Sequence, residues 1–166
     1  GVRRVLEMFA GSGQPIEYDA MVNQLKQGDA EIGGMLVTGN YPSPWVTDEL
    51  VTALGEMFTV LIDTLPNRLT DAVDVVLPGS TWAEKAGTFE NVHHRLQSFE
   101  QAITPIEFTK PEGQIALDML KQLGKVEQGW FDPAAVREEI GGALAHEVHH
   151  PDKNETRTSE MAFAEI

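Results

Sequence analysis

The residues best suited to metal chemistry lie near the end of the sequence, in the run His146-Glu147-Val148-His149-His150. This run matches the H-E-x-x-H pattern of zinc peptidases, in which two histidines one helical turn apart hold zinc and the glutamate acts as general base. However, Pro151 breaks the helix directly after the second histidine, and no rigid third ligand follows. We therefore favour a solvated helix end, where histidine also suits the negative pole of the helix. A zinc metallopeptidase stays as an alternative, and we assign no catalytic residue and no metal ligand.

A second group of polar residues lies in a non-periodic stretch, residues 81–97. Glycine lets a backbone approach a ligand or another strand closely, threonine and asparagine offer donors and acceptors, and arginine can hold an anion with two hydrogen bonds. The same residues can instead tie a long loop to the sheet, because buried polar groups must find partners, and we favour this interpretation. The candidate ligand contacts in this stretch are Glu84, Gly87, Thr88, Asn91 and Arg95.

Three short apolar segments, residues 32–38, 58–63 and 73–77, precede and position these polar residues. They alternate with helix-sized segments, a pattern typical of parallel strands with helices on both faces of the sheet. We therefore predict a three-layer αβα fold with a mainly parallel sheet. Parallel strands end at one edge, so Asp63, the loop after Gly39 and Asn40, and the 84–95 loop should converge there.

Helical spacing of apolar residues predicts the surrounding helices. For the segment 112–123 we expect a capping box formed by Thr109 and Glu112, with Pro111 in the first turn. Its apolar face should consist of Ile115, Met119, Leu120 and Leu123. The other expected helices span residues 2–9, residues 17–27 with Gly28 as a stop, a segment capped by Thr47, and residues 132–150.

Composition excludes several classes of partner and cofactor. The formal net charge of −14 would repel phosphate backbones, so we expect no nucleic-acid partner. The chain has no cysteine, which excludes iron–sulfur clusters and thiolate-held zinc within it. No window approaches the roughly 20 apolar residues of a membrane span, so we expect no direct membrane insertion. Absence of cysteine also fits a cytoplasmic location.

An ordered series of short motifs between Phe58 and Gln97 resembles the third domain of the molybdopterin-oxidoreductase superfamily. Upstream, Gly39 and Asn40 follow a strand where this superfamily has Gly-x-Asn-Pro. Each motif is weak alone, but their order over about forty residues is fairly specific. The motifs are Thr70-Asp71-Ala72, Val73-Asp74-Val75-Val76-Leu77-Pro78 for A-D-V-V-L-P, Glu84-x-x-Gly87-Thr88-x-x-Asn91 for E-x-x-G-T-x-x-N, and Arg95-x-Gln97 for the end of E-G-R-x-Q.

The resemblance implies a function and a set of cofactors. It implies an oxidoreductase component most like the large iron–sulfur subunit of NADH–quinone oxidoreductase (NADH dehydrogenase), in which this chain has no chemistry of its own. The alternative is part of a molybdopterin-dependent formate dehydrogenase. In cofactor-bearing members the loop lies near the pterin dinucleotide, which implies contacts from Gly39, Asn40 and the five loop residues. His93-His94 replaces the usual Glu-Gly, so the loop departs from the family pattern.

Further expectations concern the whole protein. Because this chain lacks cysteine for clusters and His93-His94 disrupts the loop most like a pterin contact, we expect no cofactor in it. We assign molybdopterin guanine dinucleotide and iron–sulfur clusters to the full-length protein or its partners. Those partners would be other domains or subunits of an oxidoreductase complex, through which any association with a membrane would arise. Since the chain begins inside an element, we interpret it as a fragment. Residues 1–125 should form the α/β domain, 126–150 a helical extension and 151–166 a disordered tail.

Overall fold

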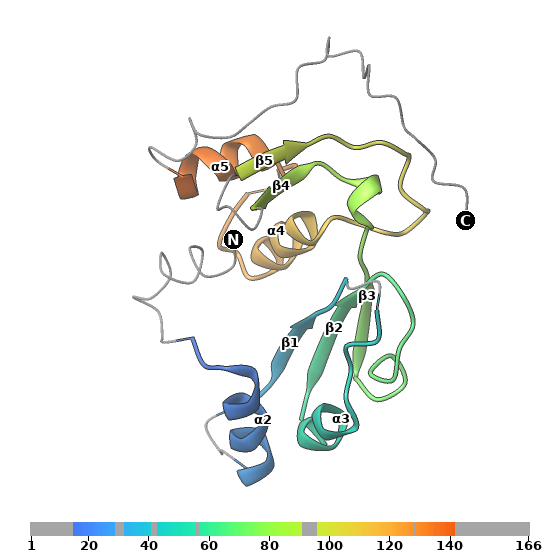
Figure 1. Ribbon diagram of the computed structural model, residues 1–166. Coiled ribbons are helices and arrows are strands. Elements are labelled where there is room, and N and C mark those ends of the chain that lie inside the picture. Colours follow the sequence, from blue (N-terminus) through green and yellow to red (C-terminus); the bar gives the residue numbers. More distant parts are fainter. Residues whose placement is uncertain are drawn as a thin grey trace, which may run out of the picture.

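A three-stranded parallel sheet forms the centre of one half of the molecule, the lower half in Figure 1. The computed structural model describes residues 15–28, 32–40, 43–55, 57–90, 96–127 and 129–141. The strands β1 (Met35–Thr38), β2 (Thr59–Asp63) and β3 (Val75–Pro78) pair in the order β1-β2-β3. Both pairs are parallel. The predicted strands and the mainly parallel α/β fold with flanking helices are thereby confirmed.

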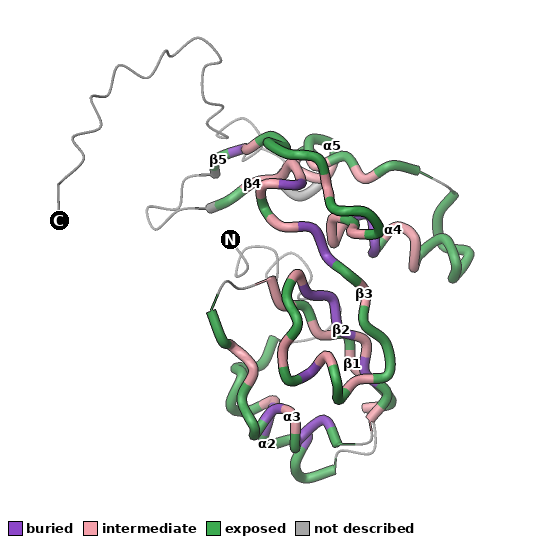
Figure 2. Tube along the Cα trace, turned by 90° about the vertical axis from the view of Figure 1, so that its right-hand side faces the viewer, coloured by how far each residue is buried: buried purple, intermediate pink, exposed green. Residues whose placement is uncertain are grey.

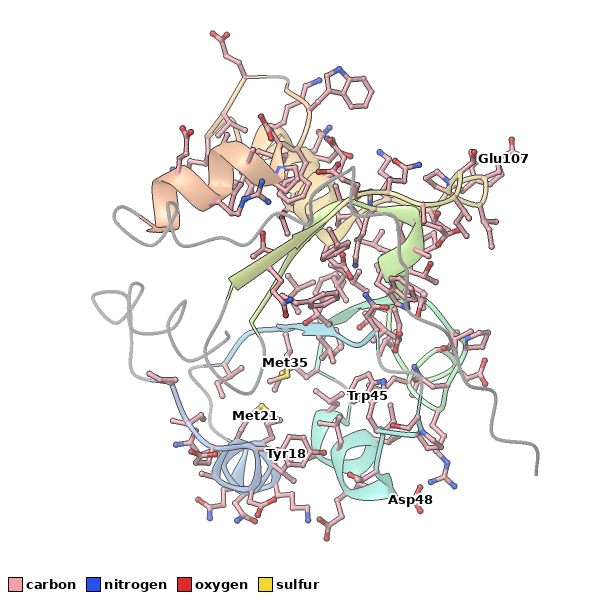
Figure 3. All side chains as sticks on the ribbon, turned by 45° about the horizontal axis from the view of Figure 1, so that its top comes forward. Tyr18, Met21, Met35, Trp45, Asp48 and Glu107 are labelled. Carbon is pink, nitrogen blue, oxygen red and sulfur yellow. The ribbon has the colours of Figure 1, made fainter. Side chains whose placement is uncertain are left out.

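Two amphipathic helices cover the face of the sheet that carries Met35, Val37 and Leu61. They are α2 (Tyr18–Gln27) and α3 (Asp48–Leu54), and each is capped as the sequence predicts. Figure 3 shows Met21 of α2 and Met35 of β1 pointing toward one another across this interface. Figure 2 shows where the buried residues lie in α2, α3 and β2. The buried members of this core are Val22, Leu25, Leu50, Ala53, Leu54, Leu61 and Leu69.

The other half of the molecule lies beyond the carboxyl ends of the strands (Figure 1). It contains the short 3-10 helix η2 (Trp82–Glu84) and an antiparallel pair, β4 (Gly87–Glu90) and β5 (Leu96–Phe99). The helices α4 (Glu112–Gln122) and α5 (Pro133–Gly141) complete it. The chain passes directly from β3 into this half, so the end of β3 in the parallel sheet determines where the second half begins.

The antiparallel pair corrects the interpretation of residues 81–97 as a non-periodic loop. Gly87 pairs with Phe99, and Phe89 pairs with Gln97. The rings of Phe89 and Phe99 stack with centroids 4.5 Å apart. The sequences of these two short strands lack a regular alternation of apolar and polar residues. The strands form because the two aromatic side chains pack against each other, and not because of local propensity.

The beginning of α4 also differs from the prediction. Pro111 is the residue before the helix, and the expected capping box is absent. The Thr109 hydroxyl donates to the Ile106 carbonyl at 2.8 Å instead, and Glu112 bonds to residues outside the helix. On the predicted apolar face Ile115 is buried, but Leu120 and Leu123 are 39% and 69% exposed.

The last described helix begins as the sequence predicts. Asp132 Oδ1 accepts a hydrogen bond from the Ala134 backbone N–H at 2.8 Å, and Pro133 occupies the first helical position. The H-E-x-x-H run, the expected tail and the expected helix at 2–9 lie outside the described residues. Within the described part of the chain, no helix is long and apolar enough to cross a membrane.

Candidate functional site at the carboxyl edge of the sheet

The carboxyl ends of the three strands meet at one edge, as the parallel sheet predicts. The Gly39 backbone N–H after β1 donates to the Ile62 carbonyl at 2.8 Å. The Gly79 N–H after β3 donates to the Asp63 carbonyl at 2.9 Å. Asp63, at the end of β2, therefore lies between the two loops. In open α/β sheets this edge is where ligands bind, so its free polar groups decide what the site can do.

The Asp63 carboxylate is buried and accepts four hydrogen bonds from its own chain. Oδ1 accepts from the backbone N–H groups of Asn40 at 2.8 Å and Thr64 at 2.7 Å. Oδ2 accepts from Asn67 Nδ2 at 2.8 Å and from the Trp45 indole N–H at 3.2 Å. A carboxylate offers about four acceptor positions. These four donors therefore fill the acceptor capacity of Asp63.

Gly39 is required because the Asp63 carboxylate occupies the space of a side chain. A Cβ at position 39 would lie 2.1 Å from Asp63 Oδ2 and 2.5 Å from Cγ, well inside van der Waals contact. The next residue, Asn40, has a φ of 77°, a left-handed conformation that asparagine tolerates better than most residues. The Gly39-Asn40 pair thus folds the loop onto Asp63 and closes the space above it.

A second polar bridge links the sheet edge to the other half of the molecule. Asn40 Nδ2 donates to Glu112 Oε1 at 2.8 Å, and Lys85 Nζ lies 2.5 Å from Glu112 Oε2. The Lys85 side chain is only 13% exposed, so its charge depends on this partner. Glu112 therefore joins the loop after β1, the segment after η2 and the first turn of α4.

Glu84 is buried and bound entirely within the chain. Its carboxylate accepts from the Thr81 backbone N–H and hydroxyl, each at 2.8 Å, and from the Ile106 N–H at 2.9 Å. The backbone N–H groups of Thr81 and then Ile106, followed by the Thr81 hydroxyl, hold the pKa of the Glu84 carboxyl below its ordinary value. Glu84 thus caps η2 and ties down the loop at 101–110.

Gly87 and Thr88 are likewise engaged by other parts of the chain. A Cβ at Gly87 would lie 2.7 Å from the Phe99 ring, so the glycine allows this ring to pack against the β4 backbone. The Thr88 hydroxyl accepts a hydrogen bond from Arg137 Nη1 of α5 at 2.9 Å. Both residues therefore hold β4 between β5 and α5.

The structure describes the positions of five of the seven predicted site residues. Gly39 and Asn40 lie at the sheet edge beside Asp63, Glu84 closes η2 directly before Lys85, and Gly87 and Thr88 lie in β4. Asn91 and Arg95 lie outside the described residues. The sequence motifs do not identify four residues that complete the network, namely Trp45, Asn67, Lys85 and Glu112.

Comparison with known proteins establishes the family of this chain. The family model described as molybdopterin oxidoreductase matches residues 10–122, which is more than half of the chain. The chain therefore belongs to the molybdopterin oxidoreductase family. This agrees with the motifs in the sequence and with the parallel sheet.

The individual relatives carry several different names. A nitrate reductase of Symbiobacterium thermophilum is 31% identical over 111 residues, 66% of this chain and 15% of the relative. A Streptomyces coelicolor protein named as a subunit of NADH-quinone oxidoreductase is 32% identical over 117 residues, 66% of this chain and 14% of the relative. A Staphylococcus haemolyticus protein named as a formate dehydrogenase is 32% identical over 85 residues, 51% of this chain and 8% of the relative. The chain thus spans a small part of each relative, and none of these three is a peptidase.

The residues around the two candidate glycines do not fit the pterin dinucleotide that the family implies. Asp63 fills the space at Gly39 and Phe99 fills the space at Gly87, so neither glycine leaves its backbone open to a ligand. The carboxylates of Asp63 and Glu84 already bind donors of the chain. In the described part of the chain, no group of three or more His, Cys, Asp or Glu side chains could hold a metal ion.

Proposed function

We propose that this chain is a structural α/β domain of an oxidoreductase subunit, most like the large iron–sulfur subunit of NADH–quinone oxidoreductase, without chemistry of its own. The observation that carries the proposal is the saturation of Asp63 by four donors from its own chain. A carboxylate at this edge can recognise a ligand only if it has acceptor positions free. Here those positions bind the loop after β1 and the turn after β2.

The interactions at the edge serve to join the two halves of the molecule. Asn40, Glu112 and Lys85 connect the parallel sheet to the half that contains α4 and the antiparallel pair. A domain of this kind supplies shape and contact surface to a larger assembly. We propose that its partners are other domains or subunits of a cytoplasmic oxidoreductase complex, and that residues 1–125 form the domain with 126–150 as a helical extension.

Elemental analysis of the purified chain tests the proposal. The chain should be produced in a host that makes molybdenum cofactor, and molybdenum should be measured per mole of protein. We expect a molybdenum content far below one atom per chain for wild type. Stoichiometric molybdenum would contradict the proposal and favour the alternative, in which the chain is part of a molybdopterin-dependent formate dehydrogenase.

A matched pair of variants strengthens this test. Asp63→Ala removes the carboxylate that fills the edge, whereas Glu127→Ala removes an exposed carboxylate from a loop far along the chain. Both should remain free of molybdenum, because Glu84 and the space at Gly87 stay occupied by other parts of the chain when the Asp63 carboxylate is removed. Loading of wild type that is lost only in Asp63→Ala would identify Asp63 as a ligand contact.

A further inference from the structure

The loop between β5 and α4 is held firmly against the segment that contains η2. The backbone N–H groups of Ala102 and Ile103 donate to the Ala83 carbonyl at 2.9 and 3.0 Å. Farther along the loop, the Ile106 N–H donates to Glu84, and the Ser80 N–H donates to the Lys110 carbonyl. The two segments therefore lie side by side, joined by hydrogen bonds at Ser80, Ala83 and Glu84.

These two neighbouring segments expose four large apolar residues, which we call the apolar tip. Trp82 is 64% exposed, Ile103 56%, Ile106 70% and Phe108 82%. Single exposed apolar residues are common, but a group of them on two segments that are hydrogen-bonded to each other is typical of a contact surface. Tryptophan is also enriched among the residues that dominate binding energy at protein interfaces.

The most exposed member of the apolar tip occupies a strained backbone position. The Thr109 N–H donates to the Ile106 carbonyl at 3.0 Å, which closes a turn over residues 106–109. The third residue of this turn is Phe108, whose φ is 73°. Glycine or asparagine is the usual choice there, because a bulky side chain in the left-handed region costs free energy. A phenylalanine that is both strained and exposed brings no folding advantage visible in the structure, which points to a role in binding.

A cavity beside Phe108 offers space for a side chain of a partner. Its volume is about 480 Å³, and Leu77, Phe108, Ile115 and Met119 contribute apolar walls. Lys110 and Asp118 also line it, but they pair with each other at 2.7 Å. The Lys110 ammonium, followed by Gln114, holds the pKa of the Asp118 carboxyl below its ordinary value. The cavity therefore presents apolar walls, a neutralised pair of charges and the polar side chains of Lys121 and Gln122.

The charge around the apolar tip selects the kind of partner. Glu100 and Glu107 are exposed on the same loop, and neither forms an ion pair with another described residue. Figure 3 shows Glu107 at the outer end of the loop, away from the body of the protein. The chain as a whole carries a net charge of −14. Complementary potentials favour a partner surface that is basic at its rim.

We propose that the apolar tip is the docking surface for another subunit of the oxidoreductase complex, a protein that inserts an apolar anchor beside Phe108 within a rim of Lys or Arg side chains. This inference rests on the proposed function, because it assumes that the chain works within such a complex. It adds the location of the interface and the chemistry of the partner surface.

Photo-crosslinking within the intact complex tests the location. The tagged full-length protein that contains this chain should be produced with its complex, with p-benzoylphenylalanine at position 108 or, as a control, at the exposed position of Lys125. We expect position 108 to crosslink to a different subunit and position 125 to give at least tenfold less of that product. Crosslinks from 108 that are equal to the control, that return to the same polypeptide or that join two copies of it would overturn the proposal.

A substitution separates binding from folding. Phe108→Asn removes the aromatic ring but suits the left-handed backbone, so the melting temperature should stay the same or rise. Recovery of the crosslinked subunit with the tagged protein should fall about tenfold, as expected for a residue that dominates an interface. The separate variant Glu107→Lys should also weaken recovery, because it places a positive charge against the basic rim of the partner. This loss should grow as ionic strength falls, because salt then screens the repulsion less. Undiminished recovery with Phe108→Asn would overturn the proposal.

The same purification distinguishes failure of this inference from failure of the proposed function. If the tagged wild-type protein brings down no other subunit, both are wrong. If it brings down other subunits but position 108 does not crosslink to any of them, the docking surface alone is wrong and the proposed function stands.

Discussion

Replacing Gly39 by alanine should destabilise the protein strongly, because the new methyl group would enter the Asp63 carboxylate. The added Cβ would lie 2.1 Å from Oδ2, so either the loop or the carboxylate must move by about 1 Å or more to reach ordinary contact. Such a shift weakens the bonds from Asn40 and from the other donors to Asp63. Each buried hydrogen bond lost costs about 1–3 kcal/mol.

The expected net effect follows from these opposing contributions. Loss of one or two bonds destabilises by roughly 1–6 kcal/mol, whereas the lower entropy of the unfolded alanine chain stabilises by about 0.4–1 kcal/mol. We therefore expect a loss of about 1–5 kcal/mol in the free energy of unfolding. For a chain of this size the melting temperature should fall by roughly 2–20 °C.

Thermal and urea unfolding monitored by circular dichroism measure this effect. The matched control is Gly33→Ala, since a Cβ at Gly33 would have no heavy atom within 4 Å and the backbone there is not left-handed. The control should leave the melting temperature unchanged or slightly raised. Equal stability of Gly39→Ala and Gly33→Ala would refute the reasoning that Asp63 fills the space above Gly39.

Three further predictions concern the rest of the network. Because hydrogen bonds lower the pKa of Glu84 in the folded state, its contribution to stability is present above the unfolded pKa of about 4.3 and lost as pH falls through the folded value. Glu84→Gln should therefore lower the free energy of unfolding at neutral pH. Between pH 7 and 3 this free energy should fall less steeply in the variant than in wild type, as measured by urea unfolding. A double-mutant cycle with Lys85→Met and Glu112→Gln should give a coupling of about 1 kcal/mol, and additive effects would mean that their ion pair contributes nothing. Gly87→Ala places a Cβ 2.7 Å from the Phe99 ring and should cost about 1–3 kcal/mol, with faster amide exchange in β4 if the ring is displaced.

The elements that the sequence predicts correctly are those with a local signal. The three strands are short apolar runs, and α2 ends at Gly28 with a φ of 70°, the conformation for which glycine is favoured. Thr47 begins α3 by accepting a hydrogen bond from the Leu50 backbone at 3.2 Å. Their convergence at one edge follows from the parallel arrangement, without knowledge of any side-chain contact.

The features that the sequence does not predict depend on contacts between distant residues. Asn40 and Glu112 are 72 positions apart, and their hydrogen bond takes away the glutamate that the capping box of α4 would use. The antiparallel pair depends on the stacking of Phe89 on Phe99. For Glu84, the sequence alone leaves ligand contact and internal hydrogen bonds as alternatives, and only the fold shows that three donors of the chain surround its carboxylate.

The chain's own donors occupy the acceptor positions of Asp63 at the edge of the sheet, and the Trp45 indole reports on this state directly. Its N–H donates to Asp63 Oδ2, whereas the other two tryptophans, Trp82 and Trp130, are 64% and 89% exposed and serve as internal controls. The measurement is a titration of GDP, the nucleotide half of a guanine dinucleotide cofactor, followed by ¹⁵N–¹H resonances of the three indoles. We predict that the Trp45 resonance stays in place up to millimolar GDP and that its N–H exchanges slowly with solvent. A saturable shift of Trp45 with unchanged Trp82 and Trp130 would contradict a filled edge.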